Sequence, residues 1–400
     1  MKILFSIAEQ HPTHRADVAV LFGKYLPRLG VETDIVTIHD PALTIPPPWP
    51  GGHALTITGS KTRLGKHLLK IVSDLRMLWY ARRGYDAIQV RDKAFAALVG
   101  LFVARLYGIK FYYWMSFPMA EAWMVFARDR GRSVGLLRWF AAWARGRMMA
   151  FILYRIVLPR ADHIFVQSNA MKDEVINRGL VAEKMTPVPM GVDPDSFRRD
   201  RPTETNIGGA SDTFVYLGTL NRLRNPGLMI EAFDLVLRKH PEAKLLLIGD
   251  AEEESDRAWL RSLIIEKGLT QNVRVTGWIP STQALSMASS CIAGLSPFPR
   301  GELLNSASPT KAVEYFALGL PVIANDQPDQ AEVLAGAGGR CVELSPLGFA
   351  DAMCAVLDNP APFQLQAIAG QKWVRNHRGY DAIANSVAAV YRSQVAKRGA

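Results

Sequence analysis

Residues 214–226 read FVYLGTLNRLRNP. The first four form an apolar run typical of a buried strand, Gly218 allows a tight turn, and Pro226 suits the first position of a helix. A strand, a turn and a helix in that order begin a βαβ unit, in which parallel strands alternate with helices. This stretch therefore predicts an α/β fold built on a parallel sheet.

The same alternation continues on both sides of this stretch. In the latter half, strands are expected at 214–217, 243–248, 272–276, 291–295 and 321–324, and helices at 226–239, 256–267, 283–288 and 310–318. Toward the N-terminus, strands are expected at 3–7, 33–38, 86–91 and 110–115, helices at 16–29 and 94–107, and a proline-rich loop at 41–52. The two series predict two doubly wound α/β domains.

The domain boundaries follow from a break in this pattern. Residues 201–211 are rich in Pro, Gly, Thr and Asn, which is typical of a linker. The sequence therefore predicts an N-terminal domain at 1–200, a C-terminal domain at 201–375 and a last helical segment at 376–400 that can pack back on the first domain. In that segment the helix 381–397 is expected to turn Ile383, Val387, Val390 and Tyr391 inward.

Composition narrows the class of protein. The chain has 400 residues, 49% of them hydrophobic and 21% charged, which is typical of globular domains. A net charge of +10 can attract nucleic acid, anionic lipid or phosphorylated small molecules. Because no nucleic-acid-binding motif is present, no nucleic-acid partner is expected.

Cysteines and hydropathy predict a cytoplasmic protein. Cys291, Cys341 and Cys354 form no CxxC pair, so neither a disulfide framework nor a zinc ribbon is expected. The apolar run 94–104, bounded by Lys93 and Arg105, is far shorter than the ~18 residues of a membrane span.

Two segments carry the chemistry. Arg222 and Arg224 follow the turn at Gly218 and Thr219. Guanidinium groups at the carboxyl end of a strand suit a diphosphate. The alternative is that both arginines are surface residues.

The second segment, residues 308–322, reads SPTKAVEYFALGLPV. Ser308 is expected to cap a helix whose first residue is Pro309, with Thr310 and Lys311 adding hydrogen-bond donors for a second anion site. Glu314 can accept hydrogen bonds from a ribose diol, or it can be a surface partner of Lys311.

Five further segments complete a resemblance to a known family: KILFS at 2–6, ADHIFVQSN at 161–169, MGVDPDSF at 190–197, LLIGD at 246–250 and VRVTGWIP at 273–280. In this order they resemble glycosyltransferase family 4, a retaining family. The resemblance implies the GT-B fold, in which two Rossmann-like doubly wound α/β domains face a central cleft. It also implies that the C-terminal domain binds the donor and the N-terminal domain the acceptor.

The resemblance assigns roles to particular residues. Arg224, with Arg222 as a second candidate, lies where the family binds the donor diphosphate, and Glu314 matches the second glutamate of the E-x7-E motif, which holds the donor ribose. The backbone at Trp278 and Ile279 lies where the family contacts the base. The turn from Ser308 to Lys311 would cap the phosphates.

The sequence also departs from the family pattern. The first glutamate of the motif is replaced by Ser306, for which Glu302 or Asn305 could substitute, and Thr219 replaces a usual arginine. A glycine-rich loop is replaced by EQHPTHR at 9–15, and a frequent histidine is missing from 113–118. His11 and His14 are the candidates on the acceptor side, although a loop histidine is more often a surface residue.

The family implies transfer of a sugar from a nucleotide-diphosphate sugar to a glycan or lipid-linked acceptor, in polysaccharide or glycoconjugate biosynthesis, with neither cofactor nor metal. A non-catalytic GT-B protein that binds a nucleotide sugar or serves as a scaffold is the alternative. Residues 119–160 combine eight arginines with interleaved tryptophan, phenylalanine and tyrosine, which predicts peripheral binding to an anionic membrane at the inner face of the cell membrane. The alternative for this segment is an ordinary helix packed on the sheet.

Overall fold

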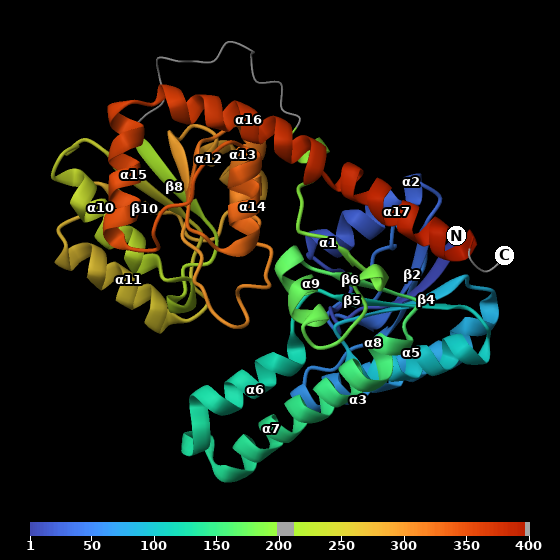
Figure 1. Ribbon diagram of the computed structural model, residues 1–400. Helices are drawn as coiled ribbons and strands as arrows, with labels where there is room; N and C mark the ends of the chain where they lie inside the picture. Colours follow the sequence, from blue (N-terminus) through green and yellow to red (C-terminus); the bar gives the residue numbers. More distant parts are fainter. Residues whose placement is uncertain (198–211, 397–400) are drawn as a thin grey trace. The chain divides into compact units, whose positions relative to one another are not determined.

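The computed structural model describes residues 1–197 and 212–396 and divides the chain into two compact units. The first comprises Met1–Pro189 and the C-terminal residues from Tyr380, and the second comprises Met190–Gly379 (Figure 1). The first unit therefore ends before the boundary expected after residue 200, and the chain returns to it after Gly379 rather than after residue 375. The expected linker at 201–211 lies outside the described residues.

The first unit is built on a parallel sheet in the order β3-β2-β1-β4-β5-β6-β7, counted over the described residues. Its strands are β1 (Lys2–Ser6), β2 (Glu32–His39), β3 (Ala54–Thr58), β4 (Ala87–Arg91), β5 (Lys110–Met115), β6 (His163–Val166) and β7 (Met185–Pro187). Its helices are α1 (Ala16–Ala19), α2 (Leu26–Arg28), α3 (Arg63–Leu75), α4 (Met77–Tyr80), α5 (Ala94–Leu106), α6 (Met119–Arg130), α7 (Leu136–Phe151), α8 (Leu158–Arg160), α9 (Asn169–Ile176) and α17 (Tyr380–Ala396). The four strands expected here are confirmed within two residues at each end.

Two features of this unit differ from the sequence prediction. The helix expected at 16–29 is interrupted by a π-helical turn at Leu21–Tyr25, where the carbonyls of Val20 and Leu21 accept hydrogen bonds from residues five positions on. The edge strand β3 was not expected, since only β2 pairs with it and its residues are partly exposed. An edge strand with mixed burial lacks the apolar run that marks a central strand.

The second unit contains a parallel sheet in the order β10-β9-β8-β11-β12, again counted over the described residues. Its strands are β8 (Thr213–Leu217), β9 (Lys244–Ile248), β10 (Val273–Val275), β11 (Ala293–Ser296) and β12 (Val322–Ala324). Its helices are α10 (Pro226–Leu237), α11 (Glu254–Glu266), α12 (Ser281–Ala288), α13 (Lys311–Ala317), α14 (Pro328–Gly336), α15 (Pro346–Asp358) and α16 (Ala361–His377). All five expected strands are confirmed, and α10 begins at Pro226 as predicted.

Helix α17 belongs to the core of the first unit. Ile383, Val387 and Tyr391 are buried, as the sequence predicts, and Val390 is partly buried against the same cluster. The Tyr391 hydroxyl donates a hydrogen bond to the Gln89 side chain of β4. The last helix thus covers one face of a sheet whose strands lie near the start of the chain.

A buried ion pair fastens the end of α16 inside the second unit. Arg378 donates to Asp329 of α14 over 2.8 Å, and each of the two side chains is about 1% exposed. Asp329 also accepts a hydrogen bond from the Ser308 hydroxyl over 2.7 Å, and the Met190 carbonyl accepts one from Arg378 over 3.3 Å. One guanidinium therefore joins segments that are far apart in the sequence.

None of the described helices is both long and apolar enough to cross a bilayer. Cys291, Cys341 and Cys354 are free thiols, as expected.

Replacing Asp329 by alanine should lower the free energy of unfolding by about 3–5 kcal/mol, because the buried Arg378 is then left with only the longer ion pair of 3.7 Å to Glu332. The measurement is chemical denaturation followed by circular dichroism. The double variant Asp329→Leu, Arg378→Met is the control, since removing both charges should restore much of the loss. Equal midpoints for Asp329→Ala and the unmodified protein would contradict this account.

Candidate functional site

The strand order of the second unit reverses between β8 and β11, and in open α/β sheets the carboxyl ends of strands at such a point are the usual ligand site. Gly218, directly after β8, has φ 144°, a conformation that side chains rarely adopt. A Cβ atom there would lie 2.9 Å from Cε of Lys311. Glycine is therefore required at this turn both for the backbone and to admit the lysine.

Lys311 is held against the strand end. Its ammonium lies 5.0 Å from the centre of the Tyr216 ring, which belongs to β8. Burial and, to a lesser extent, the positive charge of Arg224 lower the pKa of Lys311 to about 8, although the charge of Glu314 opposes the shift. A lysine whose charge is disfavoured in this way is poised to gain from a bound anion.

Arg224 reaches the same point from the other side of the turn. Residues Arg222–Arg224 form a 3-10 turn, and Asn225 then takes a left-handed conformation that starts α10. The Arg224 guanidinium lies 5.0 Å from the centre of the Phe298 ring, which follows β11. Within the described part of the chain, neither Arg224 nor Lys311 forms an ion pair at salt-bridge distance. Two cations thus share the reversal point, and Glu314, which acts on Lys311 electrostatically, does not form a salt bridge with either of them among the described residues.

Arg222 lies apart from this pair. Its guanidinium forms an ion pair of 3.3 Å with Asp256 of α11 and lies 4.9 Å from the centre of the Trp259 ring. The two arginines that the sequence places together are therefore separated: Arg224 turns to the reversal point and Arg222 to α11. Residues two apart point to the same side of an extended segment but to different sides of a 3-10 turn, so the sequence could not settle which arginine points inward.

Glu314 lies one turn into α13 and is partly exposed. Burial raises its pKa, while the charge of Lys311 and a hydrogen bond from Thr310 oppose that shift. Thr310, Lys311 and Glu314 therefore form one polar group beside Gly218. A carboxylate that interacts with Lys311 can still accept hydrogen bonds from hydroxyl groups of a ligand.

Two further contacts fix the helix that carries Lys311 and Glu314. The Tyr315 hydroxyl accepts a hydrogen bond of 2.8 Å from the backbone N–H of Leu217, at the end of β8. A Cβ atom at Gly294 would lie 2.3 Å from the Tyr315 ring, so only glycine in β11 lets α13 approach this closely. The site is thus built by packing helix against strand.

The start of α13 corrects the sequence prediction. The helix begins at Lys311, and neither Ser308 caps it nor Pro309 opens it. The Ser308 hydroxyl instead donates to Asp329 and accepts from the Met190 N–H over 2.9 Å. The Ser308 hydroxyl, which the sequence predicts to lie at the phosphates, is therefore hydrogen-bonded within this buried network.

The loop after β11 contains the positions where the family motif departs. Ser306 is fully buried and its hydroxyl donates to the Leu303 carbonyl over 3.3 Å. The Asn305 side-chain oxygen accepts hydrogen bonds from Arg300 over 3.1 Å and from the Gly301 N–H over 3.3 Å. No carboxylate replaces the missing glutamate at position 306 itself.

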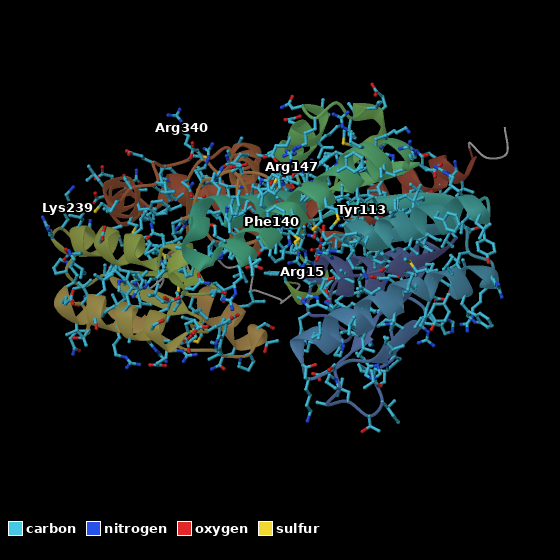
Figure 2. The ribbon with its side chains drawn as sticks, turned by 90° about the horizontal axis from the view of Figure 1, so that it is seen from below. Arg15, Tyr113, Phe140, Arg147, Lys239 and Arg340 are labelled. Carbon is cyan, nitrogen blue, oxygen red and sulfur yellow. The ribbon has the colours of Figure 1, made fainter. Side chains whose placement is uncertain are left out.

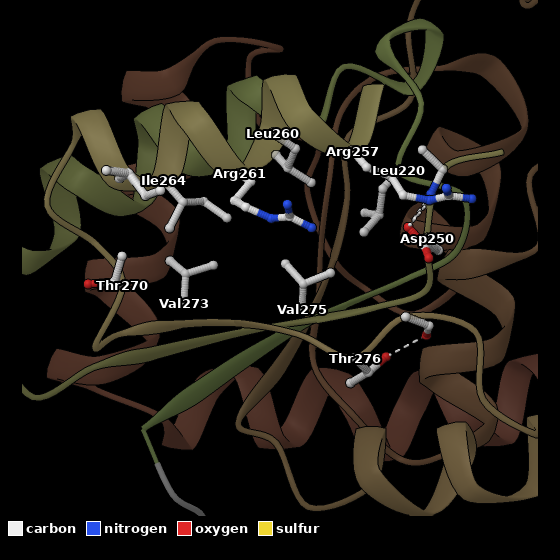
Figure 3. Close-up of a pocket in the computed structure, with 13 residues that line it drawn as sticks. Leu220, Asp250, Arg257, Leu260, Arg261, Ile264, Thr270, Val273, Val275 and Thr276 are labelled. Carbon is white, nitrogen blue, oxygen red and sulfur yellow. Dashed lines mark hydrogen bonds and ion pairs between the residues drawn. The ribbon is translucent and has the colours of Figure 1, made fainter. Parts of the chain in front are cut away.

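A pocket of about 440 Å³ lies between α11 and the edge strand β10 (Figure 3). Leu260, Arg261 and Ile264 line it from the helix, and Val273 and Val275 line it from the strand. Sequence reasoning missed this pocket, because its walls meet only when α11 packs over the sheet edge.

The pocket adjoins the segment expected to contact the base. Gly277 lines it, Trp278 directly after it is 58% exposed, and Ile279 is partly buried against the core. At the same end, Arg257 forms an ion pair of 3.2 Å with Asp250. A slot with both apolar and polar lining residues, next to an exposed indole, suits a flat ring that carries polar groups.

The first unit also reverses its strand order, between β1 and β4, and a charged cluster occupies that point. Arg91 ends β4, is fully buried and forms ion pairs of 2.8 Å with Asp17 and 3.7 Å with Glu9. Ser116 accepts a hydrogen bond of 2.8 Å from the same guanidinium. Sequence analysis did not identify this cluster; an arginine at a strand end could have indicated it, but its partners come from three separate segments.

The two histidines of the N-terminal loop are placed differently. His11 is buried, and its Nε2 donates to the Pro47 carbonyl over 2.7 Å. Its Nδ1 atom has no hydrogen-bond partner among the described residues. His14 is exposed. Both stay candidates for the acceptor side.

Comparisons with known proteins find matches for both halves of the chain. The family model described as Glycosyltransferase Family 4 matches residues 17–196, and the one described as Glycosyl transferases group 1 matches residues 211–359. An uncharacterized glycosyltransferase of Methanocaldococcus jannaschii is 27% identical over 181 residues, 44% of this chain and 42% of that protein. Glycogen synthase of Mycobacterium tuberculosis is 24% identical over 253 residues, 61% of this chain and 56% of its own length. The chain thus spans about half the length of the curated relatives it matches.

Solved structures show the same fold. HepE of Anabaena in complex with UDP matches with a TM-score of 0.70 and 16% identity, over 98% of this chain and all of that chain. Sucrose-phosphate synthase of Thermosynechococcus elongatus matches with a TM-score of 0.71 and 18% identity, over 99% and 100% of the two chains. These likenesses confirm the GT-B fold that the sequence predicts. With both halves matched by family models and the fold shared, the chain belongs to glycosyltransferase family 4, the group 1 glycosyl transferases.

Proposed function

We propose that the protein transfers a sugar, with retention at the anomeric carbon, from a nucleotide-diphosphate sugar to a glycan or lipid-linked acceptor. The observation that carries this proposal is the pair of cations, Arg224 and Lys311, at the strand reversal of the second unit with no ion pair among the described residues. Such a pair suits a diphosphate, and the relative HepE was solved with UDP and with UDP-glucose. Polysaccharide or glycoconjugate biosynthesis at the cytoplasmic face of the membrane is the setting that we propose.

The two cations would act mainly on the leaving group. As the bond between the sugar and the diphosphate breaks, negative charge grows on the phosphate oxygen that departs. Arg224 and Lys311, held in place before the reaction, stabilise that charge more than they stabilise the bound donor. The departing phosphate would take the proton of the acceptor hydroxyl. We propose that these side chains take the place of a divalent metal, and that Glu314 binds the ribose hydroxyls.

A second candidate function is donor binding without transfer. It is favoured by the buried Ser306, which stands where the family has the glutamate that touches the donor sugar. The two candidates share the site and differ only in turnover.

A turnover assay separates them. The purified protein is incubated with a panel of UDP-sugars and GDP-sugars, with and without glycan or lipid-linked acceptors, and release of the nucleoside diphosphate is followed. We expect release with at least one donor, and an unchanged rate in the presence of EDTA. Binding without transfer or slow donor hydrolysis would support the scaffold, and loss of the rate in EDTA would contradict metal independence.

Replacing Arg224 or Glu314 by alanine should weaken UDP or GDP binding, by about tenfold to a hundredfold for the arginine, because a charged hydrogen-bond partner of the ligand is lost. Isothermal titration calorimetry measures both affinities. Arg222→Ala is the matched control: since Arg222 is paired with Asp256, its removal should change the affinity less than threefold or so. The site is misassigned if Arg224→Ala and Glu314→Ala both bind as the unmodified protein does.

Binding should also depend on pH through Lys311. Its pKa is about 8 in the free protein, so the lysine is charged below that pH and loses its proton above it. A diphosphate binds the charged form, whereas the terminal phosphate of UDP is already ionised above about pH 7. Affinity for UDP should therefore hold below about pH 8 and fall as the pH rises beyond it.

Calorimetry across this range tests the assignment with Lys311→Met as the control. The variant should bind more weakly, and its affinity should stay nearly constant through the same range. An identical decline in the variant would mean that another group titrates.

A further inference from the structure

The helices on one side of the first unit expose apolar residues where a soluble surface would carry polar ones. On α3 the residues Leu64, Leu68, Ile71, Val72 and Leu75 are all exposed, at spacings of three and four that align them along one stripe. The buried side of the same helix instead carries Ser73 and Asp74, which bond to the Thr37 carbonyl and to Ser6. This helix is therefore amphipathic with its apolar side outward.

Helix α5 lies beside α3 and extends the stripe into a surface. Phe95, Leu98, Phe102 and Leu106 are exposed along it, at spacings of three and four, and Trp79 follows α3 with 64% of its surface exposed. We call this surface the α3–α5 face, defined by the exposed apolar residues of α3 and α5 together with Trp79. Large contiguous apolar patches on a monomer usually mark an interaction site.

The hairpin of α6 and α7 adds to the apolar surface of this unit. Leu136, Leu137, Phe140 and Phe151 of α7 are exposed, and Phe140 and Arg147 are labelled in Figure 2, which views the chain from below. The segment 119–160 thus exposes part of its apolar and aromatic side chains. Another part packs as an ordinary helix would, since Met149, Ile152 and Leu153 are buried. The sequence missed α3 and α5 as part of such a surface.

The charge of the same region has one sign. Residues 61–160 contain nineteen lysines and arginines and only five acidic residues, an excess larger than the net charge of the whole chain. Of the acidic residues, Asp74 and Glu121 are buried and paired. Exposed cations border the α3–α5 face: Arg82 lies over the Trp79 ring at 5.2 Å, and Arg83 over the Tyr80 ring at 5.1 Å. The partner of this surface must therefore be both apolar and anionic.

We propose that the α3–α5 face docks on a lipid bilayer that contains anionic headgroups. Leucine, phenylalanine and tryptophan side chains would enter the boundary between headgroups and acyl chains, while the arginines beside them reach the phosphate groups. A second copy of the chain fits less well, because it would bring the same positive charges together. The proposal does not rest on sugar transfer, since binding to vesicles is measured without substrate.

The experiment is cosedimentation of the full chain with vesicles of neutral phosphatidylcholine, and with vesicles in which about a third of the lipid is phosphatidylglycerol. We expect binding to the anionic vesicles that weakens at high salt. The double variant Leu68→Asp, Phe102→Asp should lower the partition coefficient by about tenfold or more, because two inserted apolar side chains are replaced by charges that the lipid repels. The variant Arg82→Glu, Arg83→Glu should lower it by about tenfold.

Matched controls come from the second unit. Leu365→Asp, Ile368→Asp changes two apolar residues of α16 that are exposed to a similar degree, and Lys239→Glu, Arg340→Glu changes two exposed cations, both labelled in Figure 2. Both controls should bind vesicles almost as the unmodified protein does. UDP affinity should be unchanged in every variant, which shows that the fold and the donor site are intact.

Three outcomes would overturn the proposal. One is the absence of binding to either kind of vesicle, which would assign the face to a protein partner. Another is equal binding of Leu68→Asp, Phe102→Asp and the unmodified protein. The third is a dimer, detected by sedimentation equilibrium, that this double variant dissociates, which would make the face an interface between two copies.

Discussion

The close approach of Lys311 to Gly218 is the constraint on which the donor site depends. Any side chain at position 218 would displace the lysine, and a shift of α13 would move the lysine away from Tyr216. Two features hold α13 in place: the hydrogen bond from Leu217 to the Tyr315 hydroxyl, and the absence of a side chain at Gly294, which lets Tyr315 pack closely. Backbone geometry and packing thus hold the side chains that we propose to bind a diphosphate in place before any ligand is present.

The fold was largely predictable because central parallel strands are buried on both faces and leave long apolar runs. β8, β9 and β5 are found with at most one residue of difference at each end from the expected ranges. The misses have physical causes. β3 is an edge strand without such a run, and the π-helical turn at Leu21–Tyr25 depends on how the helix packs rather than on its own residues.

The residues of the candidate site could be named from the sequence, whereas the directions of their side chains could not. The residue types at 222–224 and 310–314 indicate an anion site, and the structure brings Arg224, Lys311 and Glu314 together. Which side chain points where depends on partners distant in sequence: Asp256 takes up Arg222, and Asp329 takes up Ser308. A single sequence carries no direct signal for such pairs.

The return of α17 to the first sheet has a consequence for how the protein is made. Tyr391 closes a core to which Phe5 and Tyr112 already belong, yet the ribosome synthesises it after the entire second unit. During translation one face of the first sheet stays uncovered while the 190 residues of the second unit, Met190–Gly379, are synthesised. Nascent chains of this protein would therefore expose an apolar surface for almost half of their synthesis and offer a natural target for chaperones.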